Sequence, residues 1–278
     1  MALYKTFPEI ATHYMLGVKA GMSPSSAGKI LNRNLPREIE IVKQVYEEKT
    51  CDWLKVHVCW SIDTIKFLTD EGWLYIQTLL EEYSRAELGW LASMSNTANR
   101  AVTLVRNVAE KLGVNPLVLK FDRGSEFKNA ELKMLLEEIG IQGMASPRHY
   151  PGFNGKRERA NQLVEKFLPE KGGISITETY EHLERAMHCI NHELPRRIFN
   201  GKTSAQMYAE GEIYAENERE TLKNMILKHQ AEIELIKKPR WDKLDVERKS
   251  VVKSVVEMGL FKLTTRMVNA NQLQVVNV

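Results

Sequence analysis

Apolar runs in the first half of the chain predict a group of strands. Residues 56–67, 73–82 and 86–93 are rich in β-branched and aromatic side chains, and only short turns separate them. Strands joined by such short links pair antiparallel. The pattern therefore predicts three antiparallel strands in succession.

After residue 96 the pattern changes to alternating helices and strands. Helical periodicity predicts helices over 97–112 and 130–138, and short apolar runs predict strands over 117–121 and 141–145. A strand reached through a helical crossover joins its sheet in parallel. The expected fold class is α/β: a mixed sheet of three antiparallel strands, then parallel strands, with flanking helices.

The second half of the chain is mainly helical in pattern. Helices are expected from about 158 to 168, over 176–191 and over 216–238. The last of these is strongly charged with interleaved apolar residues, which fits either a solvated amphipathic helix or an oligomerisation element. Residues 239–278 are expected to form a small appendage, with a strand over 273–276.

The N-terminal residues predict two short helices around a glycine-containing turn, followed by a charged helix over 38–49. This pattern fits a helix-turn-helix, whose second helix would present Ser25, Lys29 and Arg33 to DNA. A helical hairpin used only for packing fits equally well.

Composition limits the class of protein. The 278 residues are 43% hydrophobic and 27% charged, which is typical of a globular chain with one large domain and one or two small ones. The apolar stretches are shorter than the roughly 18 residues of a membrane span, and no signal peptide is evident, so a cytoplasmic protein is expected. Three widely spaced cysteines offer neither a disulfide framework nor a zinc pattern.

Net charge is +3, which alone is weak evidence for a nucleic-acid partner. Basic residues do gather around one part of the chain, at Arg148, Lys156 and Arg159. Phosphate-binding surfaces have this character, and so do ordinary solvated faces. Arg159 fits phosphate neutralisation and a structural salt bridge equally well.

Three acidic residues carry the candidate chemistry. Asp63 lies within the first strand, Asp122 directly follows the strand over 117–121, and Glu158 opens a helical pattern after an Asn-Gly pair. Thirty-five residues lie between Asp122 and Glu158. Singly, each has a structural explanation: a surface strand residue, a turn residue, or a favourable charge at a helix N-terminus. Together, they can converge on one metal site.

Carboxylates in this arrangement suit phosphoryl transfer. Two divalent ions about 3.5–4 Å apart can activate a nucleophile and stabilise the leaving oxygen of a phosphodiester. Mg²⁺ and Mn²⁺ prefer oxygen ligands, whereas His and Cys suit zinc. Asp63, fixed in direction by its strand, is expected to bridge two such ions, with Asp122 and Glu158 each holding one.

Motifs around the acids resemble the catalytic domain shared by retroviral integrases and bacterial insertion-sequence transposases, the DDE group. They occur in the family's order: WSIDT at 60–64, FDRGSEF at 121–127, SPRHYP at 146–151, NGKRER at 154–159, and a looser tail over 191–208. The resemblance covers about residues 50–210.

The resemblance implies a ribonuclease H-like fold and metal-dependent cleavage and strand transfer at DNA 3′ ends. Asp63, Asp122 and Glu158 would be the catalytic and metal-binding residues. Water would be the first nucleophile and the freed 3′-hydroxyl the second. The implied partners are transposon-end and target DNA and further copies of the chain, in a dimer or larger assembly at the bacterial nucleoid.

The expected domain organisation has four parts. A helix-turn-helix-like DNA-binding segment would cover 1–35, a linker helix 36–52, an integrase-type catalytic core 53–210 and a charged helical region 211–278. Two alternatives to a transposase remain open at this point: a catalytically inactive DNA-binding or assembly relative, and a nuclease that cuts without joining.

Overall fold

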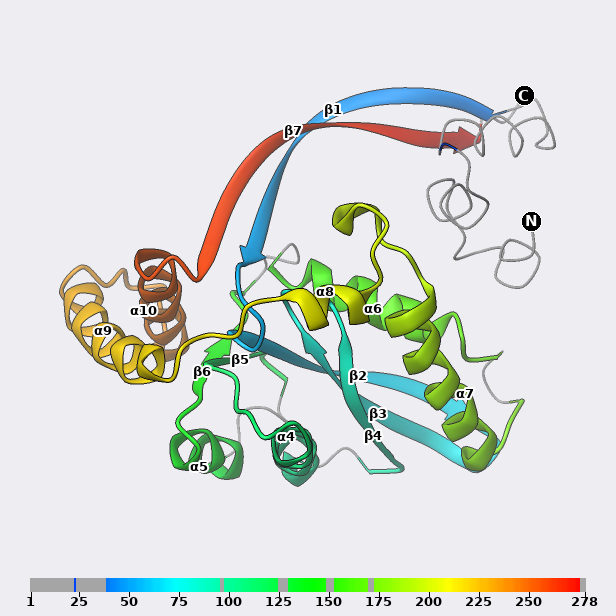
Figure 1. Ribbon diagram of the computed structural model, residues 1–278, viewed down its shortest axis with the longest axis horizontal. Coiled ribbons are helices and arrows are strands. Elements are labelled where there is room, and N and C mark those ends of the chain that lie inside the picture. The colour runs from blue at the N-terminus through cyan, green and yellow to red at the C-terminus, as the bar shows by residue number, and fades with distance from the viewer. Residues whose placement is uncertain are drawn as a thin grey trace. The chain divides into compact units, whose positions relative to one another are not determined.

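The computed structural model describes Ser23 and residues 39–95, 98–124, 130–148, 153–169 and 173–275 (Figure 1). Residues 53–194 and 203–261 form one compact unit, which contains all three acids. The other unit includes the described residues 39–52, 195–202 and 262–275. The predicted helix-turn-helix, with Lys29 and Arg33, lies outside the described residues.

A five-stranded mixed sheet forms the centre of the larger unit. Its strands are β2 (Cys59–Thr69), β3 (Gly72–Glu81), β4 (Glu87–Ser93), β5 (Val118–Phe121) and β6 (Gln142–Ala145), arranged in the order β4-β3-β2-β5-β6. The first three strands pair antiparallel, whereas β5 and β6 join in parallel. The predicted ribonuclease H-like fold class is thus confirmed.

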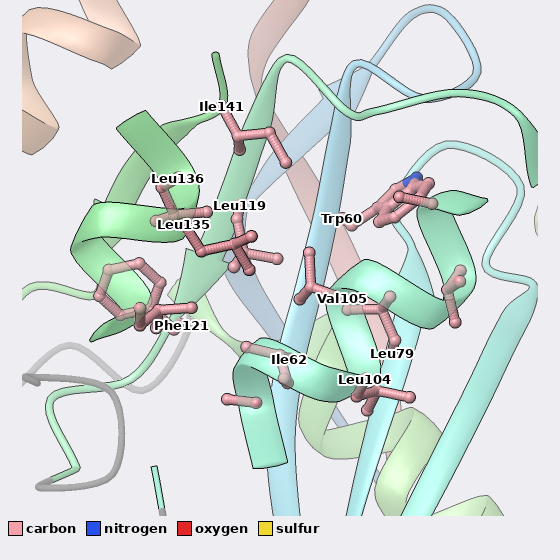
Figure 2. Packing of buried hydrophobic residues seen from close by; sticks show 14 of the residues in the cluster. Trp60, Ile62, Leu79, Leu104, Val105, Leu119, Phe121, Leu135, Leu136 and Ile141 are labelled. Carbon is pink, nitrogen blue, oxygen red and sulfur yellow. The ribbon is translucent and has the colours of Figure 1, made fainter. Parts of the chain in front are cut away.

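Two helices cover one face of this sheet. Residues of α4 (Ala98–Leu112) and α5 (Ala130–Glu138) pack against side chains from β2, β3, β5 and β6 in one buried apolar cluster. Among the cluster residues labelled in Figure 2, those that come from the strands are Trp60, Ile62, Leu79, Leu119 and Phe121. Because side chains alternate along a strand, Asp63 and Asp122 are directed to the opposite face.

The opposite face carries α6 (Gly155–Glu165) and α7 (Ile176–His188), as Figure 1 shows. A Ser175–Glu178 capping box begins α7, which continues into a π-helical turn over Cys189–Glu193. A 3-10 turn over Arg197–Phe199 follows, and then the short helix α8 (Ser204–Glu210). The expected helices of this region are therefore present.

A helical hairpin lies along the β6 edge of the sheet. It consists of α9 (Glu216–Leu235) and α10 (Lys243–Glu257), which bury Leu222, Ile226 and Val255. Leu244 of α10 packs against the apolar cluster of the sheet. An uncovered edge strand would expose unpaired backbone groups, so the hairpin shields this edge.

The hairpin corrects the expected domain organisation. Residues 203–261 belong to the same compact unit as 53–194, so the predicted division at 210/211 is not a unit boundary. The predicted helix over 216–238 is present as α9. The strand expected over 273–276 is the end of a much longer strand, β7 (Phe261–Val275), whose earlier residues were expected to belong to the charged helical region.

The linker helix predicted over 36–52 is wrong where the structure describes it. Residues 39–53 form the strand β1 (Ile39–Trp53), which pairs with β7 in a two-stranded sheet. The segment contains several β-branched residues, which favour strands once a pairing partner is present. That partner lies more than 200 residues later in the chain, beyond the reach of local pattern.

Among the helices that the structure describes, none combines the length and apolar character needed to cross a membrane.

Candidate active site

Asp63 occupies the middle of β2 on the sheet face that α6 covers. It is half-buried and lies opposite Thr78 of β3. Its Oδ2 atom accepts a hydrogen bond of 2.7 Å from Nδ2 of Asn161, and its Oδ1 atom accepts one from the Thr64 backbone N–H. Both carboxylate oxygens are therefore oriented before any ligand binds.

Asp122 follows the last residue of β5 and begins a turn. The parallel register pairs Ser61 with Lys120, and two further residues along these strands would bring Asp63 opposite Asp122. Neighbouring strands lie about 4.8 Å apart, so the two acids leave adjacent strands at nearly the same level. Oδ1 of Asp122 accepts a hydrogen bond of 2.7 Å from the Gly124 N–H, which fixes the carboxylate at the turn.

Glu158 lies in the first turn of α6 and is exposed. The Asn154-Gly155 pair starts this helix as expected, and Oδ1 of Asn154 accepts a hydrogen bond of 2.7 Å from the Ser146 hydroxyl. Asn161 is three residues after Glu158, and residues at this spacing share a helix face. Glu158 thus lies within one helical turn of a residue that contacts Asp63, while its own side chain is exposed.

Arg157 fixes the orientation of the Asn161 amide. Its Nε donates to Asn161 Oδ1 at 3.1 Å, and the Thr78 hydroxyl donates to the same oxygen at 3.3 Å. With Oδ1 engaged in this way, the amide nitrogen of Asn161 is left to donate to Asp63. Local sequence could indicate Asn161 only through its helical spacing from Glu158.

The Arg157 guanidinium is itself held by a buried ion pair. It donates to both oxygens of Glu87, at 3.0 and 3.2 Å, and to the Thr78 hydroxyl at 2.7 Å. The two side chains of the pair are only 3% and 0% exposed. A buried ion pair of this geometry is rigid, because moving either side chain away would leave the other charge buried without a partner.

Arg123, directly after Asp122, contacts the C-terminal hairpin. Its guanidinium reaches Asp242 at 2.6 Å and Asp245 at 2.7 Å. Burial would raise the pKa of Asp242, but the hydrogen bonds and charge of Arg123, with the Asp245 N–H, hold that pKa well below its usual range. Asp242 is therefore ionised at neutral pH.

Lys156, expected to contact DNA, is half-buried beside a buried carboxylate. Burial would raise the pKa of Glu82, but the charges of Lys120 and Lys156 lower it. Lys120 and Glu82 form an ion pair in which both side chains are almost fully buried. Lys156 thus contributes to the electrostatics of the sheet interior, and a DNA contact by this residue remains a prediction.

The other expected DNA contacts differ in setting. Arg148 is exposed and forms an ion pair of 2.8 Å with Asp242. Arg159 is exposed on α6. Ser25, Lys29 and Arg33 lie outside the described residues, so no contact of theirs can be assigned.

The donor set at this face suits a hard divalent cation. The three acids offer only carboxylate oxygens, which are the ligands that Mg²⁺ and Mn²⁺ prefer. Within the described part of the chain, no three His, Cys, Asp or Glu side chains lie close enough together to form a metal-binding group. The donor atoms thus suit such an ion by their chemistry alone, and the convergence of all three acids on it remains a prediction.

The sequence of this region is similar to known integrases and transposases. Residues 54–151 match the family described as Integrase core domain, a stretch that contains Asp63 and Asp122. Transposase InsF for insertion sequence IS3A of Escherichia coli K12 is 28% identical over 90 residues, covering 32% of this chain and 31% of that protein. Transposase InsF for insertion sequence IS3fB of the same strain is 30% identical over 91 residues, with the same coverage. The chain thus matches about a third of the length of these relatives.

The fold also resembles a solved structure. A chain of the simian T-cell lymphotropic virus intasome, determined by cryo-EM in complex with PP2A regulatory subunit B56 gamma, superposes with a TM-score of 0.50. The superposition covers 77% of this chain and 76% of that chain at 16% identity. At this identity the likeness concerns the fold alone.

Proposed function

We propose that this chain, whose residues 54–151 match the Integrase core domain family and whose sequence is similar to transposase InsF, is a transposase that cuts DNA 3′ ends and joins them to target DNA. The observation that carries the proposal is the placement of the acids. Asp63 and Asp122 leave adjacent parallel strands, and Glu158 lies in α6 three residues before Asn161, which hydrogen-bonds Asp63.

Asp63, Asp122 and Glu158 would hold two divalent ions, Mg²⁺ or Mn²⁺. When bound, such ions activate the attacking oxygen and stabilise the leaving oxygen of the phosphodiester. The protein's part is to fix its carboxylates in advance. Asn161 orients Asp63, and the Gly124 N–H orients Asp122, so these two carboxylates are held in place before an ion binds.

The proposed reaction has two phosphoryl-transfer steps. In the first, water attacks the phosphorus at the end of the element, the bond from phosphorus to the 3′ oxygen breaks, and a free 3′-hydroxyl results. In the second, that hydroxyl attacks a target phosphodiester and displaces the target 3′ oxygen. One phosphodiester forms for each one broken in the second step, so joining requires no external energy source.

A strand-transfer assay tests this proposal. Purified full-length protein is incubated with the DNA that flanks its coding region, a target plasmid, and Mg²⁺ or Mn²⁺. Joined product is expected for the wild type. Asp63→Asn, Asp122→Asn and Glu158→Gln should each lower the rate by at least about 100-fold without changing the melting temperature.

The matched control is Glu110→Gln, which changes an exposed carboxylate on α4, the helix on the opposite face of the sheet. Its rate should equal that of the wild type. Binding of the ends without any product would favour a catalytically inactive relative, and cut ends that are never joined would favour a nuclease. An active Asp63→Asn protein would refute the assignment of the acids.

A further inference from the structure

The guanidinium of Arg123 joins the α9–α10 hairpin to the turn that carries Asp122. Besides its ion pairs with Asp242 and Asp245, it donates from Nε to the Ser146 carbonyl oxygen at 2.8 Å. The side chain is 15% exposed. All three guanidinium nitrogens are thus engaged, and the backbone next to Asp122 is tied to two other segments of the unit.

The two acids that bind Arg123 are also held in place by hydrogen bonds to the backbone. Asp242 is the N-cap of α10, and with Asp245 it forms a capping box. Oδ1 of Asp242 accepts from the Asp245 N–H, and Oδ2 of Asp245 accepts from the Asp242 N–H. Each carboxylate therefore uses one oxygen to cap the helix and the other to bind Arg123.

The same arginine is connected to the helix that carries Glu158. Ser146 receives the Arg123 Nε–H at its carbonyl, donates its hydroxyl to Asn154, and pairs its N–H with the Phe121 carbonyl at 2.9 Å. Asn154 is the N-cap of α6. One short chain of hydrogen bonds thus links the hairpin to both segments that follow the parallel strands.

A second arginine attaches the hairpin at the other end of these strands. Arg219 of α9 donates to the carbonyl oxygens of Asn115 at 2.9 Å, Pro116 at 3.1 Å and Gly140 at 2.8 Å. These carbonyls precede β5 and β6, whereas Asp122 and Ser146 follow them. At about 3.3 Å per residue, the two attachments are roughly a strand length apart, so Arg219 anchors the hairpin without touching the acids.

We propose that Arg123 is a positioning residue for the catalytic acids and that the cap of α10 acts through it, which makes the C-terminal hairpin a working part of the active site. The inference rests on one part of the proposed function, the shared metal site of the three acids, because positioning has meaning only for acids that act together. A displacement of a catalytic group by about 1 Å can lower a rate on the order of 100-fold. Loss of the contacts that Arg123 makes beside Asp122 is therefore expected to slow the reaction.

The test compares Arg123→Gln with Arg219→Gln in the full-length protein. Both changes remove a guanidinium that joins the hairpin to the strands, but only the first lies beside an acid. Mn²⁺ binding is measured by water proton relaxation, strand transfer by product formation, and unfolding by thermal melting. Arg123→Gln should weaken Mn²⁺ binding by about 10-fold and slow transfer by 10- to 100-fold, in the range found when groups that orient metal ligands are removed.

Arg219→Gln should leave Mn²⁺ affinity and rate within about twofold of the wild type, whatever its effect on melting. Asp242→Asn provides a second variant, because asparagine still caps a helix but lacks the charge that holds Arg123. It should shift both readouts in the same direction as Arg123→Gln, and Arg123→Lys, which cannot form the planar fork, should restore them only in part.

The outcomes separate the two proposals. If Arg123→Gln and Arg219→Gln change Mn²⁺ affinity equally, in proportion to lost stability, the hairpin is only structural and the positioning role is overturned. If Arg123→Gln alone weakens Mn²⁺ binding but the wild type joins no DNA, positioning stands and the transposase proposal fails. A wild-type protein that binds no Mn²⁺ overturns both.

Discussion

Arg157 shows how one buried side chain can orient Asp63, a proposed catalytic acid, without touching it. Replacing Arg157 with alanine would leave the buried Glu87 without its partner and release the Asn161 amide from its orientation. An unpaired buried charge of this kind costs about 3–5 kcal/mol. Urea denaturation at pH 7 should therefore show a loss of that size in the free energy of unfolding.

Two variants control this prediction. Arg106→Ala removes an exposed ion pair with Glu138 and should cost less than about 1 kcal/mol. The double change Arg157→Met with Glu87→Leu removes both buried charges, so it should be more stable than Arg157→Ala alone. If Arg157→Ala costs no more than Arg106→Ala, the buried pair does not have the rigidity attributed to it.

His57 predicts a pH dependence of stability. Its ring is buried, its Nδ1 accepts from the Trp60 indole at 3.0 Å, and burial lowers its pKa to about 4, below the usual 6.5. The folded state therefore favours the neutral ring, and this stabilisation is present above pH 6.5 and lost as pH falls toward 4. The loss between pH 7 and pH 4 should be about 3 kcal/mol.

The comparison variant is His57→Asn, since asparagine tolerates the positive φ of 62° at this position. This variant lacks the His57 titration. The difference in unfolding free energy between the wild type and the variant should therefore change by about 3 kcal/mol between pH 7 and pH 4. Glu81 remains in both proteins; burial raises its pKa to about 7, and its opposite contribution cancels in the comparison. Equal pH profiles for the two proteins would show that His57 titrates normally in the fold.

Sequence reasoning proposed the three acids but not the residues that contact or support them in the structure. Asp63, Asp122 and Glu158 carry local signals: a strand, a turn and a helix start. Arg157 and Glu87 are 70 residues apart in the chain, and their pairing depends on how α6 crosses the sheet. Nothing in the sequence near Arg123 indicates that its partners lie in α10.

At the scale of elements, periodicity predicted the helices and strands of the sheet region closely. The helix over 130–138 has the expected bounds, and β2 to β6 differ by a few residues from expectation. The failures are β1, predicted as a helix, and the length of β7, of which only the end was predicted as a strand; the two strands pair with each other. Strand pairing over so long a separation leaves no local signature, because the stabilising contacts are not neighbours in sequence.

In the segment between α8 and α9, a larger side chain at Gly211 is expected to destabilise the protein. A Cβ atom on Gly211 would meet the Val56 side chain and lie 2.7 Å from a ring carbon of Tyr83. Gly211→Ala should therefore destabilise the protein by about 1–3 kcal/mol, as overpacking usually does. Chemical denaturation gives the measurement.

Gly155 is the matched control for this change. A Cβ atom there would meet nothing within 4 Å, and the residue begins α6. Gly155→Ala should be neutral or stabilising by up to about 1 kcal/mol, because alanine is the better helix former. Equal losses from the two substitutions would mean that the link can move aside and that the contacts of Gly211 do not limit packing.

At the scale of the whole molecule, the hairpin changes where the compact unit that contains the three acids ends. The domain expected from sequence stops at residue 210, whereas the compact unit continues to Phe261. The difference arises because a charged amphipathic helix has the same pattern whether its apolar stripe meets a partner helix, a sheet edge or another copy of the chain. Only the three-dimensional arrangement shows that Leu244 enters the core cluster and that Arg219 binds the strand ends.

Two fragments test this boundary. Residues 53–261 contain the whole larger unit and should melt cooperatively, whereas residues 53–210 would uncover the β6 edge and the apolar residues beneath α10. Exposed edges of this kind pair with other chains. The shorter fragment should therefore aggregate or melt at least about 10 °C lower, since the loss of several kcal/mol shifts the melting temperature by that much. Circular dichroism melting and sedimentation provide the readouts. If the fragment over 53–210 is monomeric and as stable as the longer one, the hairpin is an appendage. The contacts of Arg123 with the hairpin would then not be needed to position the proposed catalytic acids.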